Sequence, residues 1–453
     1  KGCTTCLKRC PTEAIRIRNN RASILNERCI DCGECIKVCA NHAKVAVTDP
    51  LESIKRFKYP IALPAPTLYA QFQGVHQPEP IIASLFRLGF VDVFEVARAA
   101  EIVSYAISRA MREEDRPKPV ISSACPAILR LIQVSFPALL DNVIDFVSPM
   151  EAAAKIAKEE YAQKHGVDKA DVGVFFITPC AAKMTAVKSP VGQEKSHVDG
   201  VIAIKDVYAQ MRAAMKQGFS PLEIDRASVV GIKWAIPGGE VEAVGIKSSL
   251  CVDGIDNVIN VLEAIENARF RNLTYFEGLA CVNGCLGGPL TVENSFVAKN
   301  RLRSVMNRTL QKTVQRREIF EDAVQTLRMT RPIEPSDALQ LSGTMKERIE
   351  REDRIERLTM SLPGLDCGSC GSPSCRALAE DIVSGHANEL NCVFRLNDRI
   401  NSLAAEMLTL GTSTRYTTGE DMARLRRLHD ELSRSEPSEA PDGGADDDGG
   451  DST

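Results

Sequence analysis

Hydrophobic and polar residues follow two alternating patterns along most of the chain, and these patterns predict strands that alternate with helices. Continuous apolar runs of strand length occur at residues 59–66, 171–179 and 200–207, whereas residues 149–166 repeat apolar positions with helical spacing. Strands that alternate with helices are typical of parallel α/β domains. We therefore expect one large α/β domain between residues 49 and 330.

The last part of the chain has a different pattern. Residues 343–360 are dense in charge at helical spacing, which predicts a solvated helix. Residues 394–410 form an amphipathic pattern that suits either packing on the body of the protein or dimerisation, and packing is the favoured interpretation. Residues 436–453 hold seven acidic residues and no basic one among Gly, Pro and Ser, so we expect a disordered tail.

The composition narrows the class of protein. The chain has 453 residues, 44% of them hydrophobic, which is enough for a large core spread over several domains. The formal net charge is −4, and without the seven acids of the tail it is +3. The protein therefore lacks the strong positive charge that would favour binding to nucleic acid. No apolar run reaches the ~18 residues of a membrane helix, and no secretory segment is visible. We expect a soluble, cytoplasmic protein.

The sixteen cysteines fall mostly into groups with close spacings such as CxxC. Such spacings favour metal clusters in a reducing compartment, and a disulfide scaffold is the weaker alternative. The first group lies in "CTTCLKRCP" and "CIDCGECIKVCA", and its members are Cys3, Cys6, Cys10, Cys29, Cys32, Cys35 and Cys39.

The spacing of this first group is that of a bacterial two-cluster ferredoxin, in which the fourth cysteine of each motif binds the other cluster. The first motif lacks its leading cysteine, and we expect that the chain was cut before Lys1. One [4Fe-4S] cluster would then use Cys3, Cys6 and Cys39. The other would use Cys29, Cys32, Cys35 and Cys10. Strand-like segments at residues 14–25 and 43–47 suit the βαβ repeat of such a module, and zinc is the weaker alternative.

A second group lies near the other end of the chain, where a glycine-rich loop is followed by sixteen residues of helical pattern. Its members are Cys367, Cys370, Cys375 and Cys392. Four thiolates on a small loop and helix unit can hold one [4Fe-4S] cluster. Tetrahedral zinc is a more serious alternative here than in the first group.

The third group is dispersed over three loops, each of which follows a strand-like apolar run. Its members are Cys125, Cys180, Cys281 and Cys285. Loops at the ends of buried strands are where an α/β domain assembles a site, so we expect the four thiols to meet. Unrelated buried cysteines are the alternative. Cys251 is interpreted as an ordinary buried thiol.

The third group resembles the signature loops of the [FeFe] hydrogenases. The three loops read "SSACP" at residues 122–126, "TPCAAK" at 178–183 and "LACVNGCLGGP" at 279–289, and "LPAPTLYAQF" at 63–72 is similar to a further segment of that family. The order, the spacing and the neighbouring Pro, Lys and Gly residues agree with the family pattern. With the ferredoxin-like module, the resemblance covers about residues 1–330.

The resemblance implies roles for these residues. Cys125, Cys180, Cys281 and Cys285 would hold the [4Fe-4S] half of the H-cluster, and Cys285 would also bridge to a diiron unit with CO, cyanide and azadithiolate ligands. Lys183 would donate a charge-assisted hydrogen bond to one cyanide, with Pro179 beside it.

The departures from the family pattern concern proton transfer. In fast members of the family a second cysteine precedes the first ligand cysteine and relays the proton, and Ala124 stands there in this chain. The usual glutamate of the second loop is Ala186, and the stretch between Glu101 and Glu113 has no acid. Thr178 and Leu279 replace two methionines. This combination is similar to the sensory-type branch, which implies slow turnover.

The resemblance implies a two-lobed α/β hydrogenase that converts H2 to protons and electrons at an H-cluster. Its partners would be H2, protons, maturation proteins and a redox partner such as ferredoxin or a signalling protein. Two alternatives stay open: an iron-sulfur electron-transfer or assembly protein without the diiron unit, and a fast bidirectional hydrogenase with a substitute proton path. The expected regions are a ferredoxin-like domain at residues 1–48, an H-cluster domain at 49–330, a helical linker at 331–361, a C-terminal [4Fe-4S] unit at 362–395, and a helix with an acidic tail at 396–453.

Overall fold

A computed structural model describes residues 3–218, 225–309, 324–339 and 343–413, together with six residues between 419 and 427. The chain forms two compact units, Lys1–Gln340 and Leu341–Thr453, which we describe separately. The predicted acidic tail at residues 436–453 lies outside the described residues. Within the described part, no helix combines the length and the apolar composition that crossing a bilayer requires.

The first unit begins with the small cysteine-rich module. It contains α1 (Thr5–Lys8), an antiparallel hairpin of β1 (Ile15–Arg18) and β2 (Arg21–Ile24), and α2 (Glu34–Lys37). The hairpin forms because Asn19 and Asn20 both adopt positive φ, as its two-residue turn requires. The prediction of a strand-like segment at residues 14–25 is confirmed.

The predicted strand at residues 43–47 is wrong. Residues 42–50 form no regular element, and Val45 and Val47 expose 69% and 72% of their surface. A β-strand is stable only when it pairs with a neighbour. This segment has no paired strand, and it leads instead to Asp49, whose backbone and side chain both bond to Val201.

The rest of the first unit is an α/β domain with two parallel sheets, in agreement with the two-lobed domain expected from the sequence. The first sheet has the order β4-β3-β6-β7, and its strands are β3 (Tyr59–Pro64), β4 (Asp92–Val93), β6 (Val172–Thr178) and β7 (Gly200–Ala203). The second has the order β5-β9-β8, and its strands are β5 (Val120–Ile121), β8 (Ser249–Asp253) and β9 (Tyr275–Leu279). The three predicted strands at residues 59–66, 171–179 and 200–207 are thus β3, β6 and β7.

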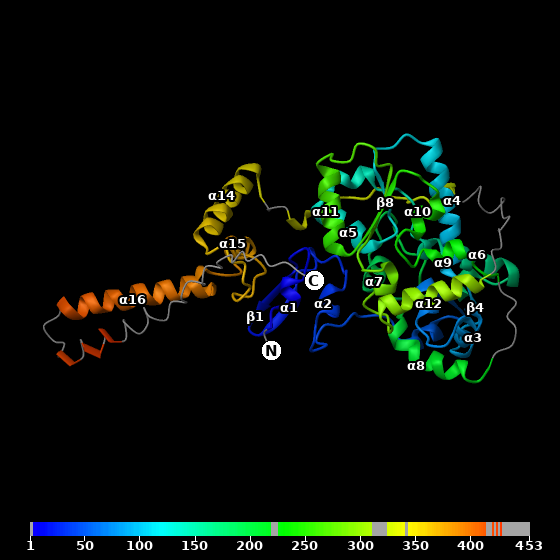
Figure 1. Cartoon of the computed structure of the whole chain (residues 1–453), viewed down its shortest axis with the longest axis horizontal. Helices are drawn as coiled ribbons and strands as arrows, with labels where there is room; N and C mark the ends of the chain where they lie inside the picture. Colours follow the sequence, from blue (N-terminus) through cyan, green and yellow to red (C-terminus); the bar gives the residue numbers. More distant parts are fainter. Residues whose placement is uncertain are drawn as a thin grey trace, which may run out of the picture. The chain divides into compact units, whose positions relative to one another are not determined.

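Helices lie against both sheets, and Figure 1 shows β8 between α11 and α10, which contact it. The α-helices are α3 (Glu79–Arg87), α4 (Val96–Glu113), α5 (Pro126–Ser135), α6 (Pro149–His165), α7 (Ala181–Lys188), α8 (Ile204–Met215), α9 (Val229–Lys233), α10 (Gly239–Val244), α11 (Ile255–Glu266) and α12 (Ser295–Arg308). Short 3-10 helices are η1 (Leu51–Arg56), η2 (Pro66–Ala70), η3 (Pro137–Asn142), η4 (Lys169–Asp171), η5 (Gly284–Gly287) and η6 (Asp337–Leu339). Strands β6 and β9 are buried along their whole length, which explains their continuous apolar runs.

The second unit is small and helical. It contains α14 (Met345–Ser361), α15 (Cys375–Val383), η7 (Glu389–Asn391) and α16 (Val393–Ser413). The predicted solvated helix is confirmed as α14, in which Ile355 is the one buried residue. The predicted sixteen-residue helix before Cys392 is wrong, because α15 has nine residues and the chain turns at Gly385, which adopts positive φ.

Candidate functional site

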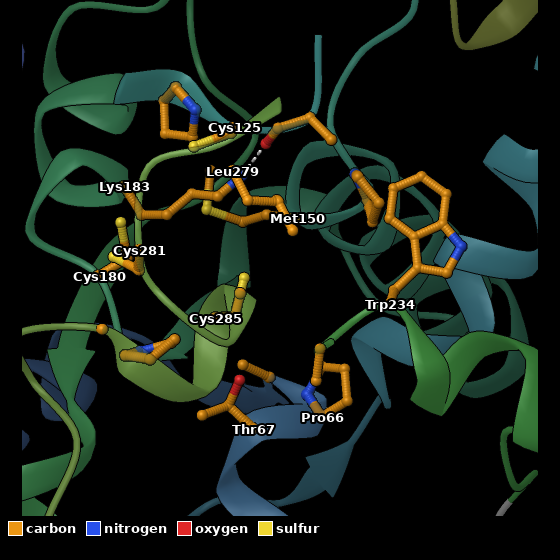
Figure 2. A pocket seen from close by; sticks show the side chains of 18 of the residues that line it. Pro66, Thr67, Cys125, Met150, Cys180, Lys183, Trp234, Leu279, Cys281 and Cys285 are labelled. Atoms are coloured by element: carbon orange, nitrogen blue, oxygen red, sulfur yellow. Dashed lines mark hydrogen bonds between the residues drawn. The ribbon is translucent and has the colours of Figure 1, made fainter. Parts of the chain in front are cut away.

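The four dispersed cysteines line one cavity of about 110 Å³ in the α/β domain. Figure 2 shows Cys125, Cys180, Cys281 and Cys285 around this space. Their loops follow β5, β6 and β9 in the chain. The carboxyl ends of parallel strands are where open α/β sheets bind ligands, which explains why cysteines up to 160 residues apart (125 to 285) meet here.

Two of these cysteines stand at helix starts. Cys125 is the N-cap residue of α5, and Pro126 at the first helical position favours this start because its fixed φ suits a helix. Cys180 is the N-cap residue of α7, and its backbone N–H donates to Thr178 Oγ1 at 3.0 Å. Thr178, which replaces a methionine of the family pattern, therefore stabilises the turn that carries Cys180.

The third loop packs so tightly that it needs glycine. A Cβ atom at Gly287 would lie 2.0 Å from the Val282 carbonyl oxygen, and one at Gly288 would lie 2.2 Å from the Pro179 carbonyl oxygen. Both distances are far below van der Waals contact. The second cysteine loop and the third are thus in direct backbone contact, which fixes the position of Cys285 relative to Cys180.

The electrostatics of the site disfavour bare thiolates. Burial raises the pKa of Cys180 to about 11 and the pKa of Cys281 to about 12, and it also raises the pKa of Cys285. Neighbouring thiols raise these pKa values further, whereas Lys183 lowers that of Cys180. Thiolates in this cavity would need several positive charges nearby, and the irons of a cluster would supply them.

Lys183 extends from α7 toward the first cysteine loop. Its Nζ donates to the carbonyl oxygen of Ala124 at 3.2 Å, which Figure 2 shows as a dashed line. The ammonium is therefore held at the edge of the cavity, beside Ala124 and Cys125. Pro179 also lines the cavity.

Thr67 is a cavity residue that the sequence analysis did not single out. Its Oγ1 is buried and has no hydrogen-bond partner among the described residues, and the side chain lies at the cavity in Figure 2. An unpartnered buried hydroxyl costs free energy unless a ligand satisfies it. The site thus fits a group that carries hydrogen-bond acceptors, such as cyanide. The available signal was a polar residue after Ala-Pro at the end of a buried strand.

Two buried glutamates also line the cavity, and sequence reasoning missed both. Glu240 accepts hydrogen bonds from Ser122 Oγ at 2.7 and 2.8 Å and from the Tyr275 hydroxyl at 2.7 Å. Glu277 accepts from the backbone N–H groups of Gly238 at 3.1 Å and Val241 at 3.0 Å.

The environment of these glutamates favours a bound proton. Burial, followed by the charge of Glu277, raises the pKa of Glu240 to about 8, and burial also raises the pKa of Glu277. Glu277 lies in the middle of the buried strand β9, and an acid at such a position was the signal available in the sequence. Cys251, expected to be buried, is half-buried on β8, where burial and the charge of Glu277 raise its pKa.

The cysteine-rich module adjoins the site. A second cavity, of about 300 Å³, is lined by Cys10, Cys29, Cys32 and Cys35, the set expected for one of the two clusters. Cys32 lines the first cavity as well. The remaining three, Cys3, Cys6 and Cys39, lie close enough for Cys3 and Cys39 to raise the pKa of Cys6, although its burial has the larger effect.

Lys37 of the module also interacts with the site. Burial lowers its pKa, but the Cys281 sulfur and Glu34 raise it by more, and its Nζ lies 2.8 Å from Glu34 Oε1. A positive charge therefore lies between the module and the cavity.

In the second unit, Cys370 and Cys375 pack against the small core that contains Cys392, whereas Cys367 is exposed on the preceding loop. The backbone N–H of Cys375 donates to Asp366 at 2.6 Å, which fixes the loop against the start of α15. Within the described residues, no three His, Cys, Asp or Glu side chains are arranged to hold a single metal ion.

Three protein families match the chain. Residues 58–245 match the family described as the iron only hydrogenase large subunit, C-terminal domain, residues 1–44 match a 4Fe-4S dicluster domain, and residues 362–394 match a putative Fe-S cluster domain. The fold is thus α/β with a dicluster domain before it and an Fe-S domain after it. The first match ends before the loop that carries Cys281 and Cys285.

Curated relatives agree with this assignment. The chain is 25% identical over 323 residues to the NADP-reducing hydrogenase subunit HndD of Solidesulfovibrio fructosivorans, covering 57% of this chain and 55% of HndD. It is 28% identical over 212 residues to iron hydrogenase 1 of Clostridium pasteurianum, covering 44% of this chain and 36% of that protein. The chain thus spans about half of the first relative and about a third of the second.

A solved structure of a variant of the [FeFe]-hydrogenase HydA1 from Chlamydomonas reinhardtii aligns with 63% of this chain and 96% of its own at 15% identity and a TM-score of 0.47. The resemblance to the [FeFe], or iron-only, hydrogenases rests on the family match at residues 58–245 and on the two curated relatives. The matches to the dicluster domain and the Fe-S domain indicate iron-sulfur clusters.

Proposed function

We propose that this protein is a slow, sensory-type [FeFe] hydrogenase. It would interconvert H2 with protons and electrons and would pass the electrons through its [4Fe-4S] clusters to a redox or signalling partner in the cytoplasm. The observation that carries the proposal is that four cysteines from three loops line one apolar cavity, while the expected relay position beside it holds Ala124.

The cavity has residues suited to each part of the H-cluster. Cys125, Cys180, Cys281 and Cys285 would hold the cubane, and Cys285 would bridge to the diiron unit. Lys183 and Thr67 offer donors for cyanide. When bound, the diiron unit would supply the heterolytic cleavage of H2. The residues Pro66, Met150, Trp234 and Leu279 line the same space and would exclude water from it.

The methyl group of Ala124 neither accepts nor donates a proton, so the usual relay is absent. Glu240 and Ser122 supply the substitute that we propose. Glu240 lines the cavity and holds a proton, and Ser122 Oγ, bonded to that carboxyl, also accepts from the backbone N–H of Ala124 at 3.2 Å. A proton would leave the cavity through Glu240 and Glu277. Loss of one general acid-base group costs ~10²- to 10⁴-fold in rate, so slow turnover is expected.

The electron route would run through the module. Cys32 lines both cavities, so a cluster on Cys10, Cys29, Cys32 and Cys35 would adjoin the cubane of the H-cluster. The C-terminal unit, with Cys367, Cys370, Cys375 and Cys392, would offer a second exit for electrons. The iron and sulfide content of the isolated protein decides whether this unit holds a [4Fe-4S] cluster or zinc.

The test is infrared spectroscopy of protein that is coexpressed with the [FeFe] maturation proteins. We expect CO and cyanide stretching bands, together with weak hydrogen evolution from reduced viologen. Absence of these bands in iron-loaded protein would show an electron-transfer or assembly protein instead. Turnover close to that of fast enzymes would exclude the sensory assignment.

A single substitution tests whether slow proton transfer limits turnover. Ala124→Cys should raise turnover by about tenfold or more, because it returns a proton carrier next to the cavity. Ala124→Ser serves as the matched control for a small polar side chain with a much higher pKa. An unchanged rate in Ala124→Cys, with infrared bands intact, would count against slow proton transfer as the cause of slow turnover.

A further inference from the structure

The helix α16 carries an apolar stripe with coiled-coil spacing. The residues of the stripe, which we call the α16 seam, are Val393, Leu396, Ile400, Leu403 and Met407. They follow one another at alternating intervals of three and four residues, the a and d positions of a heptad repeat. Each is exposed, from 39% for Leu396 to 59% for Met407. A contiguous exposed apolar stripe of this kind marks an interaction surface.

The period of the seam indicates what kind of partner fits. An ideal α-helix has 3.6 residues per turn, so a 3.5-residue repeat stays on one line only when two helices wind around each other. Two facing helices are the smallest assembly that covers such a seam of a and d positions. The partner is therefore a single helix with the same period, and a second copy of α16 is such a helix.

The charges that flank the seam specify its direction. Arg399 and Glu406 occupy g positions. Within one chain, a guanidinium nitrogen of Arg399 lies 3.9 Å from Glu406 Oε1, which is a long ion pair. If a second helix runs antiparallel, with Ile400 opposite Leu403 of the other copy, Arg399 of each copy lies beside Glu406 of the other. A parallel arrangement would place Arg399 beside the neutral Ala404. Charges at such positions set the orientation of coiled coils.

We propose that the α16 seam binds the α16 seam of a second copy of this chain as an antiparallel two-stranded coiled coil. This pairing covers the five apolar residues and forms two symmetric Arg399–Glu406 pairs. Of the two interpretations open from the sequence, the heptad period and the flanking charges of the seam favour dimerisation. Because the seam begins one residue after Cys392, the dimer would place one C-terminal cysteine unit at each end of the coiled coil.

The first test measures the mass of the full, cluster-loaded chain by sedimentation equilibrium over a range of concentrations. We expect a dimer for the natural sequence and a monomer for Ile400→Asp. Ala405→Asp is the matched control, since Ala405 is exposed on the same helix but lies off the seam, and it should remain dimeric. A monomeric natural protein, or a dimer that survives Ile400→Asp, would overturn the proposal.

The second test is a charge exchange. Arg399→Glu and Glu406→Arg should each weaken the dimer several-fold, because each places like charges together across the antiparallel interface. The double variant Arg399→Glu/Glu406→Arg should return the dissociation constant to that of the natural protein. Both residues are exposed, so neither change should disturb folding, which circular dichroism verifies. Single variants that dimerise as tightly as the natural protein would overturn the antiparallel arrangement.

Discussion

Two of the four-cysteine groups of the chain, one in the α/β domain and one in the C-terminal unit, have different surroundings. In the α/β domain, the four cysteines line an apolar cavity. Three of them lie in loops that follow β6 and β9, which are buried along their whole length. In the C-terminal unit, Cys367 is exposed, and the loop needs Gly368 and Gly371 at positive φ. Large buried cores surround the first site, whereas the second has a core of a few residues. The two groups of cysteines thus differ in the extent to which the surrounding protein buries and supports them.

The largest expected effect concerns the bridging cysteine. Cys285→Ala should abolish hydrogen evolution and the CO and cyanide infrared bands, because the proposed link between cubane and diiron unit is lost. Cys251→Ala is the control, since Cys251 is a thiol of the same domain outside the ligand set, and it should keep the bands. Cys392→Ala, in the C-terminal unit, should also keep them. Bands that persist in Cys285→Ala would refute the assigned bridge.

The proton route gives the next largest effect. Glu240→Gln should lower turnover by ~10²- to 10⁴-fold, because an amide cannot relay a proton, while the infrared bands remain. Gln fits the same space and can still bond to Ser122 and Tyr275. An unchanged rate would exclude Glu240 from the route.

The pH dependence follows from the raised pKa of Glu240. The carboxyl is protonated below about pH 8 and ionised above it, so hydrogen evolution should fall as the pH rises through 8. Because the folded-state pKa exceeds the unfolded one, this group supports folding fully at acidic pH and its contribution is lost as the pH rises to 8. Glu240→Gln should remove both effects, which rate profiles and thermal unfolding between pH 6 and 9 would measure.

The difference in scaffolds predicts a difference in hydrogen exchange. Removal of the iron by a chelator under reducing conditions should speed amide exchange in α15 about tenfold or more, because metal binding and folding are coupled in small cysteine units. Exchange in α4, most of whose apolar face is buried, should change little. Equal acceleration in both helices would show that the α/β scaffold also depends on its clusters.

The sequence predicted the parts of this architecture that depend on local pattern. The buried strands β3 and β6 were visible as apolar runs, and the cysteine loops were visible because each follows such a run. The two wrong predictions have a common cause, because in both segments the tertiary structure overrides the local pattern. Residues 43–47 have β-prone side chains but no paired strand. The helix before Cys392 ends at Val383, and the chain turns at Gly385, although the helical pattern continues.

The sequence indicated the four cysteines of the cavity together with Ala124, Pro179 and Lys183, but not its other polar residues. Glu240 and Glu277 are 37 residues apart, and they meet because α10 packs against β9. Neither the contact nor the desolvation that raises their pKa values is encoded in a local motif. Thr67 is likewise recognisable only once its hydroxyl is seen to be buried without a partner. Sequence patterns reveal ligands with fixed spacing, whereas the surrounding proton and hydrogen-bond groups come from the fold.

The smallest effect expected concerns Lys37. Its ammonium is held by Glu34 and interacts with the Cys281 sulfur, so it should stabilise the extra negative charge of a reduced cluster at the cavity. Lys37→Met should make the reduction potential of that cluster more negative, and a charge interaction of about 1 kcal/mol corresponds to roughly 40 mV for one electron. Lys37→Arg keeps the charge and should keep the potential. Redox titration followed by infrared and electron paramagnetic resonance spectra would measure the shift, and the C-terminal cluster, which belongs to the other unit, provides the internal reference. Equal potentials in Lys37→Met and Lys37→Arg would show that the lysine only positions the module.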